Sequence, residues 1–163
     1  MSDLTQSRHY DYIPIIDREP FKLPDGARVA VMPYLNIEHF PAAIAGTSLI
    51  PGTAGFSPDP LNYGWRDYGN RVGLWRMKEL MDKLGMRATV CLNSEIIREY
   101  PRIVEEALAS NWAFIGHGIN NAPANFIGNA PDGQGGHTPL SEEREREIIS
   151  TVCNTLEEAI GRK

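Results

Sequence analysis

The stretch MRATVCLNSEIIREYPRIVEEALASNWAFIGHG (residues 86–118) holds two short apolar runs separated by a helical pattern. The runs at 86–93 and 112–118 are rich in apolar, β-branched and aromatic residues, which favours strands. Between them, the pattern predicts a short helix near 95–100 and another from 101 to 110. A strand, a helical connection and a second strand predict a βαβ unit, and hence parallel strands.

The same alternation extends to both sides of this unit. Upstream, Asp25-Gly26 predicts a turn that leads into a buried strand at about 28–36, and a long irregular loop is expected at 41–64. Downstream, Ser141 is expected to cap a helix that runs to about residue 160. The order of strands and helices indicates an α/β protein with a parallel sheet or barrel.

The segment between that loop and residue 86 predicts another helix, with Asn70 as its N-cap and Gly85 at its end. Four of its apolar residues fall on one face at helical spacing, and we expect this stripe to belong to the core: Leu74, Met77, Met81 and Leu84.

Composition excludes several classes of protein. The chain has 163 residues, 42% of them hydrophobic and 23% charged, which suits one globular domain. Its net charge of −5, without a lysine or arginine run, argues against a nucleic-acid partner. The polar N-terminus and the lack of a membrane-length apolar run predict a cytoplasmic protein without a membrane anchor. Cys91 and Cys153 have no CxxC spacing, so reduced thiols are expected.

Three predicted strands end in polar residues, and ligands of parallel α/β folds sit at the carboxyl ends of strands. Glu38 and His117 are the first candidate pair, because a carboxylate and an imidazole can share a hydrolytic metal or act as base and acid. The alternative is an exposed glutamate and a hydrogen-bonded turn histidine. His39 flanks the pair, whereas His137 is expected on a surface loop.

A second candidate region is NYGWRDYGNRVG (residues 62–73). Arginine favours bidentate recognition of planar polar groups, and tyrosine and tryptophan line pockets, so this region could bind substrate. The alternative is an arginine–aspartate pair that ties the loop to the helix that follows. A two-histidine metal site would want an imidazole near position 121, where Asn121 offers only a weak ligand for zinc.

Three strands are too few to close a parallel barrel, and an open parallel edge exposes unpaired backbone groups. Either the domain is a small open sheet, or another chain completes it.

The segment DYGNRVGLWRMKELMDKLGMRATVCLNSEIIREYPRIVEEAL (67–108), followed by GHGINN, resembles the polysaccharide deacetylase (NodB-homology) superfamily. It is most similar to the intracellular branch of metal-independent allantoinases and cyclic imide hydrolases. The resemblance runs from about residue 28 to the end and implies the N-terminal half of a deformed (β/α) barrel. Residues 1–27 would be an extension, and a second polypeptide would carry the C-terminal half in a hetero- or homo-oligomer.

The resemblance also assigns individual positions. Asn36 stands where the family's catalytic-base aspartate is usual, and Glu38 stands where its metal-binding aspartate is usual. His117 matches the first histidine of the second motif, and Asn121 replaces the second. These departures imply either no cofactor or a weakly held zinc on Glu38, His117 and Asn121.

We therefore expect a subunit of a hydrolase that cleaves the C–N bond of a small amide, cyclic imide or ureide. Glu38 and His117 would be catalytic, and the substrate-binding residues would be Asn36, Trp65, Arg66, Tyr68, Arg71 and Asn121. Two alternatives remain: a catalytically inactive barrel half that serves as a binding or assembly subunit, and a metal-dependent N-deacetylase of a carbohydrate.

Overall fold

The computed structural model describes residues 11–42, 52, 56, 58–122 and 140–161. The chain forms two compact units, one within residues 1–31 and one within 32–163. In the first unit, Pro24–Gly26 forms a short turn in which Asp25 and Gly26 have φ of 56° and 71°. This confirms the turn expected at Asp25-Gly26.

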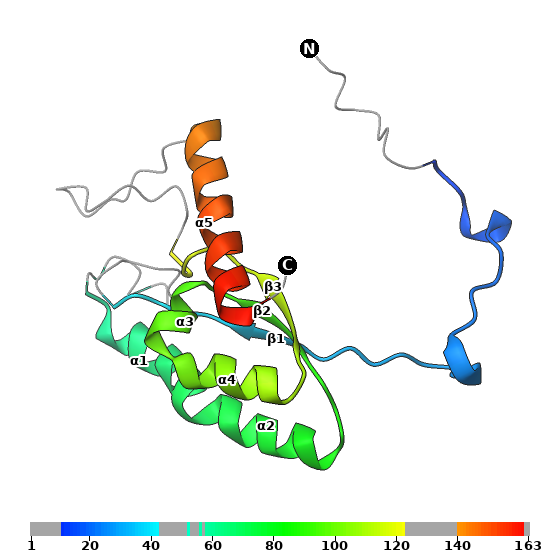
Figure 1. Ribbon diagram of the computed structural model, residues 1–163, viewed down its shortest axis with the longest axis horizontal. Helices are drawn as coiled ribbons and strands as arrows, with labels where there is room; N and C mark the ends of the chain where they lie inside the picture. The colour runs from blue at the N-terminus through cyan, green and yellow to red at the C-terminus, as the bar shows by residue number, and fades with distance from the viewer. Residues whose placement is uncertain (1–10, 43–51, 53–55, 57, 123–139, 162–163) are drawn as a thin grey trace. The chain divides into compact units, whose positions relative to one another are not determined.

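The second unit is built on a parallel sheet of three strands in the order β1-β2-β3 (Figure 1). Their bounds are Tyr34–Ile37, Thr89–Leu92 and Ala113–Gly116. The register aligns Ile37 with Leu92 and Leu92 with Gly116, so the three strands end level with one another. The predicted α/β class with a parallel sheet is confirmed.

Helices connect the strands. Between β1 and β2 they are α1 (Pro60–Tyr68), the π-helical turn η4 (Gly69–Gly73) and α2 (Leu74–Lys83). The β2–β3 connection holds α3 (Glu95–Glu99) and α4 (Pro101–Ala109), and α5 (Glu142–Ile160) follows β3. No helix of the described residues is long and apolar enough to cross a membrane.

Local signals explain where these helices begin and end. The side chain of Asp59 accepts a hydrogen bond from the Asn62 N–H and so caps α1. Ser141 caps α5 in the same way through the Arg144 N–H, as expected, and Gly161 ends α5 with φ of 73°. Gly85 follows α2 with φ of 64°, which confirms the expected helix end.

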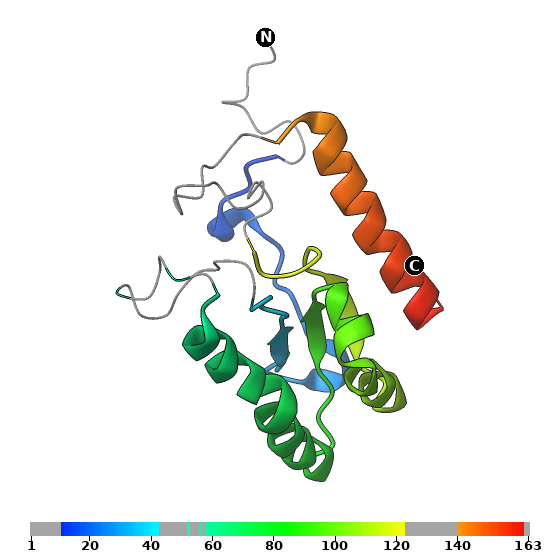
Figure 2. The ribbon, with the colours of Figure 1, turned by 90° about the vertical axis from the view of Figure 1, so that its left-hand side faces the viewer.

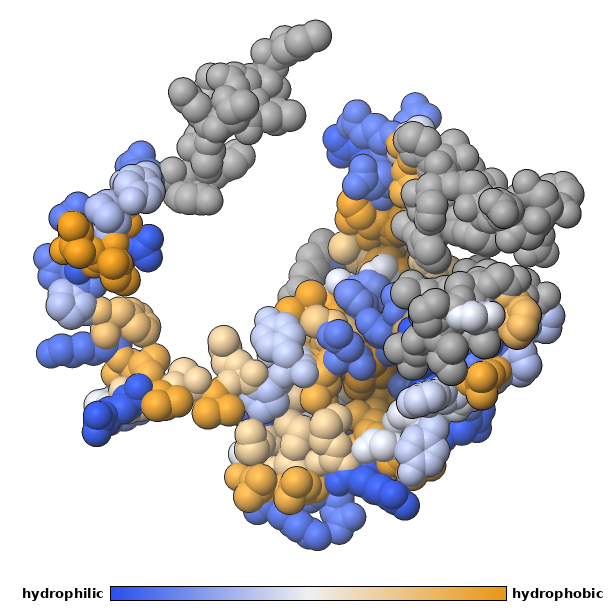
Figure 3. All heavy atoms as spheres, turned by 180° about the vertical axis from the view of Figure 1, so that it is seen from behind, coloured by the Kyte–Doolittle hydropathy of each residue, from blue (hydrophilic) through white to orange (hydrophobic). Residues whose placement is uncertain are grey.

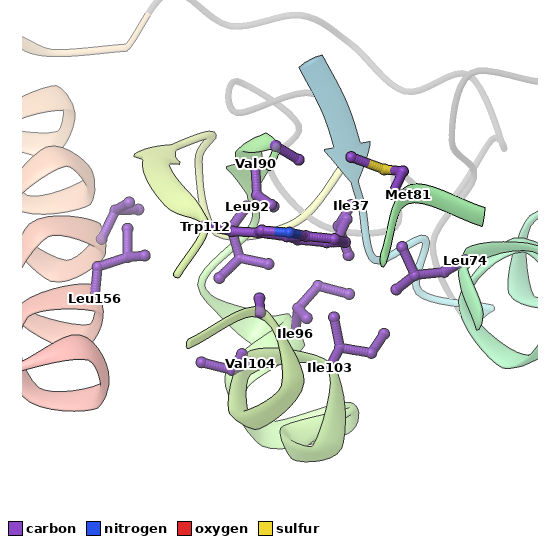
Figure 4. Packing of buried hydrophobic residues seen from close by; sticks show 13 residues of the cluster. Ile37, Leu74, Met81, Val90, Leu92, Ile96, Ile103, Val104, Trp112 and Leu156 are labelled. Carbon is purple, nitrogen blue, oxygen red and sulfur yellow. The ribbon is translucent and has the colours of Figure 1, made fainter. Parts of the chain in front are cut away.

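One face of the sheet packs against the helices and forms the core. Val90 and Leu92 are fully buried, and Trp112 lies flat against this layer (Figure 4). α2 and α4 lie side by side in both ribbon views, and Lys78 Nζ of α2 reaches Glu106 Oε2 of α4 at 3.7 Å (Figures 1 and 2). The other buried apolar residues are Ile37, Leu74, Met81, Ala88, Ile96, Ile103, Val104, Ala107, Val152 and Leu156.

The other face of the sheet is not covered in this way. Successive side chains of a strand point to opposite faces, so Asn36, Cys91 and Ile115, which are paired in register, share this face. Ile115 is 42% exposed, and Tyr34 on the same face is 56% exposed. Figure 3 shows hydrophobic residues at the surface of this unit among polar ones. Parallel sheets are normally covered on both faces, whereas in the described part of the chain this face leaves Tyr34 and Ile115 exposed.

Two expectations upstream of α1 are corrected. The strand expected at 28–36 begins only at Tyr34, after Pro33, which has no N–H to donate to a ladder. The loop expected at 41–64 ends earlier, because α1 already begins at Pro60. Residues 43–51, 53–55 and 57 of that loop lie outside the described residues.

The same region changes the expected helix start and its apolar stripe. Asn70 is not an N-cap, because the chain is already helical from α1 through η4. Leu74 and Met81 are buried as expected, but Met77 is 38% exposed and Leu84 is 62% exposed. Leu84 lies at the helix end, and Met77 lines a hollow beside β1.

The packing of α5 on β3 leaves little room at Gly116. A Cβ atom there would lie 3.0 Å from Val152 Cγ1 and 3.1 Å from Leu156 Cδ1. We expect Gly116→Ala to lower the free energy of unfolding by about 1–3 kcal/mol, the usual cost of overpacking, as measured by urea denaturation. The control Gly64→Ala meets nothing within 4 Å in α1 and should raise stability by about 0.5–1 kcal/mol. Equal effects of the two substitutions would contradict this packing.

Candidate functional site

The carboxyl ends of the three strands carry the candidate site. Glu38 follows β1, Asn93 follows β2 and His117 follows β3. The backbone ladder continues for one step beyond the strands, because the Asn93 N–H donates to the Ile37 carbonyl at 3.3 Å and the His117 N–H donates to the Leu92 carbonyl at 3.0 Å. The residues that follow therefore meet at one edge of the sheet.

Glu38 and His117 form a hydrogen-bonded pair at this edge. His117 Nε2 lies 3.0 Å from Glu38 Oε1, and the Asn121 amide donates to Glu38 Oε2 at 2.9 Å. The Glu38 side chain is 20% exposed and that of His117 is 43% exposed. The structure thus brings together three residues that the sequence singled out, with both carboxylate oxygens engaged.

Two further asparagines hold this pair, and the sequence did not assign them to the site. The Asn70 amide donates to the Glu38 carbonyl at 2.9 Å. Asn93 Oδ1 accepts the His39 N–H at 2.9 Å, and Asn93 Nδ2 donates to the His117 carbonyl. The position of Asn93 at the end of a strand could have assigned it to the site. The sequence around Asn70 instead indicated a helix N-cap.

A hollow of about 700 Å³ lies beside β1 and is lined by Glu38, whereas His117 is not among its lining residues. Its polar lining includes Asn36, Glu38, Arg66, Asn70 and Asn121. A hollow of this size, with a few convergent polar groups, is typical of sites for small molecules.

Arg66 is the cation of this hollow. Its guanidinium carbon lies 3.7 Å from the ring centre of Phe40, which fixes the plane of the group. Burial lowers the Arg66 pKa, and the negative charges of Glu38 and Asp59 act in the opposite direction. Nη1 is buried and has no hydrogen-bond partner among the described residues.

The remaining residues of the 62–73 region lie elsewhere. Trp65 and Tyr68 line a different hollow, and their side chains are 64% and 52% exposed. Arg71 Nε donates to Asp67, which also accepts the Tyr100 hydroxyl. The arginine–aspartate pair considered as the alternative is present, but it joins α1 to η4 within one helical run and does not tie a loop to a helix. A substrate contact by Trp65, Tyr68 or Arg71 stays a prediction.

The other two histidines have different surroundings. His39 Nδ1 lies 2.7 Å from Glu95 Oε2, and its ring packs edge-on to Tyr100 with the ring centres 6.1 Å apart. His39 therefore flanks the site as expected, with its ring held by Glu95. His137 lies outside the described residues.

The donor set fits zinc poorly. Glu38, His117 and Asn121 offer one carboxylate, one imidazole and one amide, and no group of three His, Cys, Asp or Glu residues gathers elsewhere in the described part of the chain. The amide of Asn121 presents its nitrogen, not its oxygen, to Glu38. Zinc sites usually use at least three strong nitrogen, sulfur or carboxylate ligands.

Comparison with known proteins identifies a similar fold. No family model and no curated protein matches the sequence. Among solved structures, the chain is similar to the crystal structure of PuuE allantoinase, with a TM-score of 0.67 and 18% identity. The match covers 94% of this chain and 52% of that one, so the chain spans about half the length of the structure it matches. At this identity the likeness concerns the fold alone.

The surroundings of Tyr100, including its hydrogen bond to Asp67, change the pKa of its hydroxyl group. Burial raises the Tyr100 pKa, and hydrogen bonding to the Asp67 carboxylate raises it further. The folded state thus holds this proton more tightly than the unfolded state, where the pKa is about 10. The resulting stability is present below about pH 10 and is lost as the pH rises toward the folded-state pKa.

We expect an ultraviolet titration of the folded protein to show one tyrosine that ionises above the others, and Tyr100→Phe to remove that step. Tyr12→Phe, at a 90% exposed position, is the control and should leave it in place. Persistence of the late step in the Tyr100 variant would contradict the Asp67–Tyr100 contact.

Proposed function

We propose that this chain supplies the acid–base pair of a hydrolase that cleaves the C–N bond of a small amide, cyclic imide or ureide. The observation that carries the proposal is the Glu38–His117 hydrogen bond at the carboxyl ends of β1 and β3. Ligands of parallel α/β folds bind at this edge. The fold of an allantoinase supports the same class of reaction.

The contacts assign a role to each residue. Glu38 accepts the proton on His117 Nε2, so Nδ1 of the neutral ring is the basic nitrogen. Nδ1 takes a proton from water while the water oxygen bonds to the substrate's carbonyl carbon. The C–N bond then breaks, and the departing nitrogen receives that proton from Nδ1.

Other groups of the hollow assist this reaction. Asn121 holds the second oxygen of Glu38, which keeps the carboxylate turned toward His117. Arg66 places a positive charge in the hollow where negative charge develops on the carbonyl oxygen. No step of this scheme uses a metal.

We further infer that a second polypeptide, one that carries the other half of the barrel, completes the site. The uncovered sheet face with Tyr34 and Ile115 supports this, because a parallel sheet is stable when both faces are covered. The likeness to 52% of an allantoinase supports it as well. The same face also favours a second candidate function, that of an assembly subunit without catalysis.

Activity tests the proposed pair. We expect the protein, isolated with any partner it has, to hydrolyse at least one compound of a panel that contains succinimide, hydantoin, allantoin and simple amides. Glu38→Gln and His117→Asn should each lower kcat by about 100-fold or more, the range of a lost acid–base group, as measured by release of the product acid or amine.

Glu79→Gln is the matched control, because Glu79 is an exposed carboxylate that pairs with Lys83 on the surface of α2. It should retain full activity. If Glu38→Gln and His117→Asn both keep the wild-type rate of hydrolysis, the assigned acid–base pair is refuted. If the wild-type protein hydrolyses no compound of the panel, the second candidate function, an assembly subunit without catalysis, is favoured.

Association tests the uncovered face. We expect the protein isolated from its source to sediment as a complex heavier than the 18.2 kDa chain. Ile115→Asp, which places a charge on the uncovered face, should weaken association by roughly 10-fold or more, as expected for a buried interface residue. Ile149→Asp, at a 55% exposed position of α5, is the control. A wild-type chain that sediments as a monomer would contradict this inference.

A further inference from the structure

The peptide unit between Glu38 and His39 is hydrogen-bonded to two asparagine side chains, one at its carbonyl oxygen and one at its N–H. Its carbonyl oxygen accepts from Asn70 Nδ2 at 2.9 Å, and its N–H donates to Asn93 Oδ1 at 2.9 Å. This peptide unit carries the Cα of Glu38 at one end, so its orientation decides where the carboxylate of Glu38 points. Two side chains from distant parts of the chain, η4 and the end of β2, thus fix one peptide plane.

Asn93 also reaches the other half of the catalytic pair. Its Nδ2 donates to the carbonyl of His117, so one amide group joins the residue after Glu38 to the backbone of His117. The orientation of this amide follows from its partners, because a backbone N–H can only donate and a carbonyl can only accept. Asn93 is fully buried, with 0% of its surface exposed.

The chemistry of the amide suits this place in the sheet. Beyond the strands, backbone hydrogen bonds still join the segments that follow: the Ser94 N–H donates to the Gly118 carbonyl at 3.0 Å, and the Asn121 N–H donates to the His39 carbonyl at 2.8 Å. A primary amide offers an acceptor and a donor, as a peptide group does, so the Asn93 side chain continues the ladder on both sides. It does so without charge, which leaves Glu38 as the charged partner of His117.

We propose that Asn93 and Asn70 are positioning residues that hold Glu38 and His117 at hydrogen-bond distance. The proposal rests on the proposed function for its effect on catalysis, but the contacts that it describes exist in the chain alone. Asn93 is fully buried and does not line the hollow, and Asn70, which does line it, directs its amide nitrogen to the Glu38 carbonyl. Their loss should therefore lower the rate of the chemical step and leave substrate affinity unchanged, since a displacement of about 1 Å can cost roughly 100-fold in rate.

The first test uses leucine, which has nearly the shape of asparagine and no polar atoms. We expect Asn93→Leu and Asn70→Leu to lower kcat by about 10- to 100-fold with KM within about twofold of the wild type. Asn154→Leu, at an exposed position of α5, is the matched control and should change neither constant. Unfolding curves confirm that each variant is folded.

The kinetic outcomes separate the possible roles. A rise in KM at constant kcat would make Asn70 a substrate contact and overturn its positioning role. If folded Asn70→Leu keeps the kcat and KM of the wild type, the hydrogen bond from Asn70 to the Glu38 carbonyl does not position Glu38 for catalysis. Should Asn93→Leu fail to fold, Asn93→Gln, which keeps the amide but displaces it by one methylene, replaces it and should show the same loss of kcat.

The second test needs no catalysis and so separates this proposal from the proposed function. In the isolated chain, Glu38→Gln should move the ring ¹⁵N resonances of His117, because the two side chains share a hydrogen bond. With Asn70→Leu or the folded Asn93 variant already present, the same substitution should move them much less. If Glu38→Gln moves the His117 ring ¹⁵N resonances by the same amount in the wild type and in both asparagine variants, the asparagines do not hold Glu38 and His117 together. This result would count against the positioning role whether or not the protein is a hydrolase.

Discussion

The parallel pairing of three short strands is the constraint on which the site depends. Its register brings Ile37, Leu92 and Gly116 level, so the residues after each strand meet at one edge. Glu38 and His117 are 79 positions apart in the sequence and reach a 3.0 Å contact only through this register. β2 lies between β1 and β3, and the neutral amide of Asn93 at its end bonds to the segments after both strands. The Asn121 N–H also joins these two segments directly, because it donates to the His39 carbonyl at 2.8 Å.

Much of this arrangement could be predicted from the sequence, because it depends on local patterns. Apolar runs, cap residues and terminal glycines located β2, β3, α4 and α5, and strand-end polarity located Glu38 and His117. The start of α1 was missed although Asp59 and Pro60 form an ordinary N-cap and first turn, since the surrounding prolines and glycines suggested a loop.

Long-range partners could not be predicted in the same way. No local pattern shows that Asn70 bonds to the Glu38 carbonyl, because the two residues meet only after the sheet and α2 have packed. The pairing of Arg71 with Asp67 is local, since the two residues are four positions apart, but the Tyr100 hydroxyl that also donates to Asp67 comes from 33 positions away and has no local signal. The direction of a side chain on a helix next to a hollow depends on tertiary packing.

The pair and the hollow also bear on the proposal that a second polypeptide completes the site. Glu38, Asn121 and Asn36 line a hollow beside β1, an edge strand of the sheet, and the sheet face that bears Asn36 is uncovered. Under that proposal, an element that covers this edge of the described sheet would limit the access of bulk water and strengthen the electrostatic interactions of Glu38 and His117. The covering element would thus contribute to catalysis as well as to stability.

The most direct measurement of the central claim is an NMR titration of the protein, in the assembly in which it is isolated, with a cyclic imide such as succinimide. The account predicts that the backbone amide signals of Glu38, His117 and Asn121 shift together and saturate at one ligand concentration. Shifts confined to the groove between β3 and α5, around Cys153 and Leu156, would contradict it. So would an absence of any shift at the strand ends with a ligand that the assembly hydrolyses.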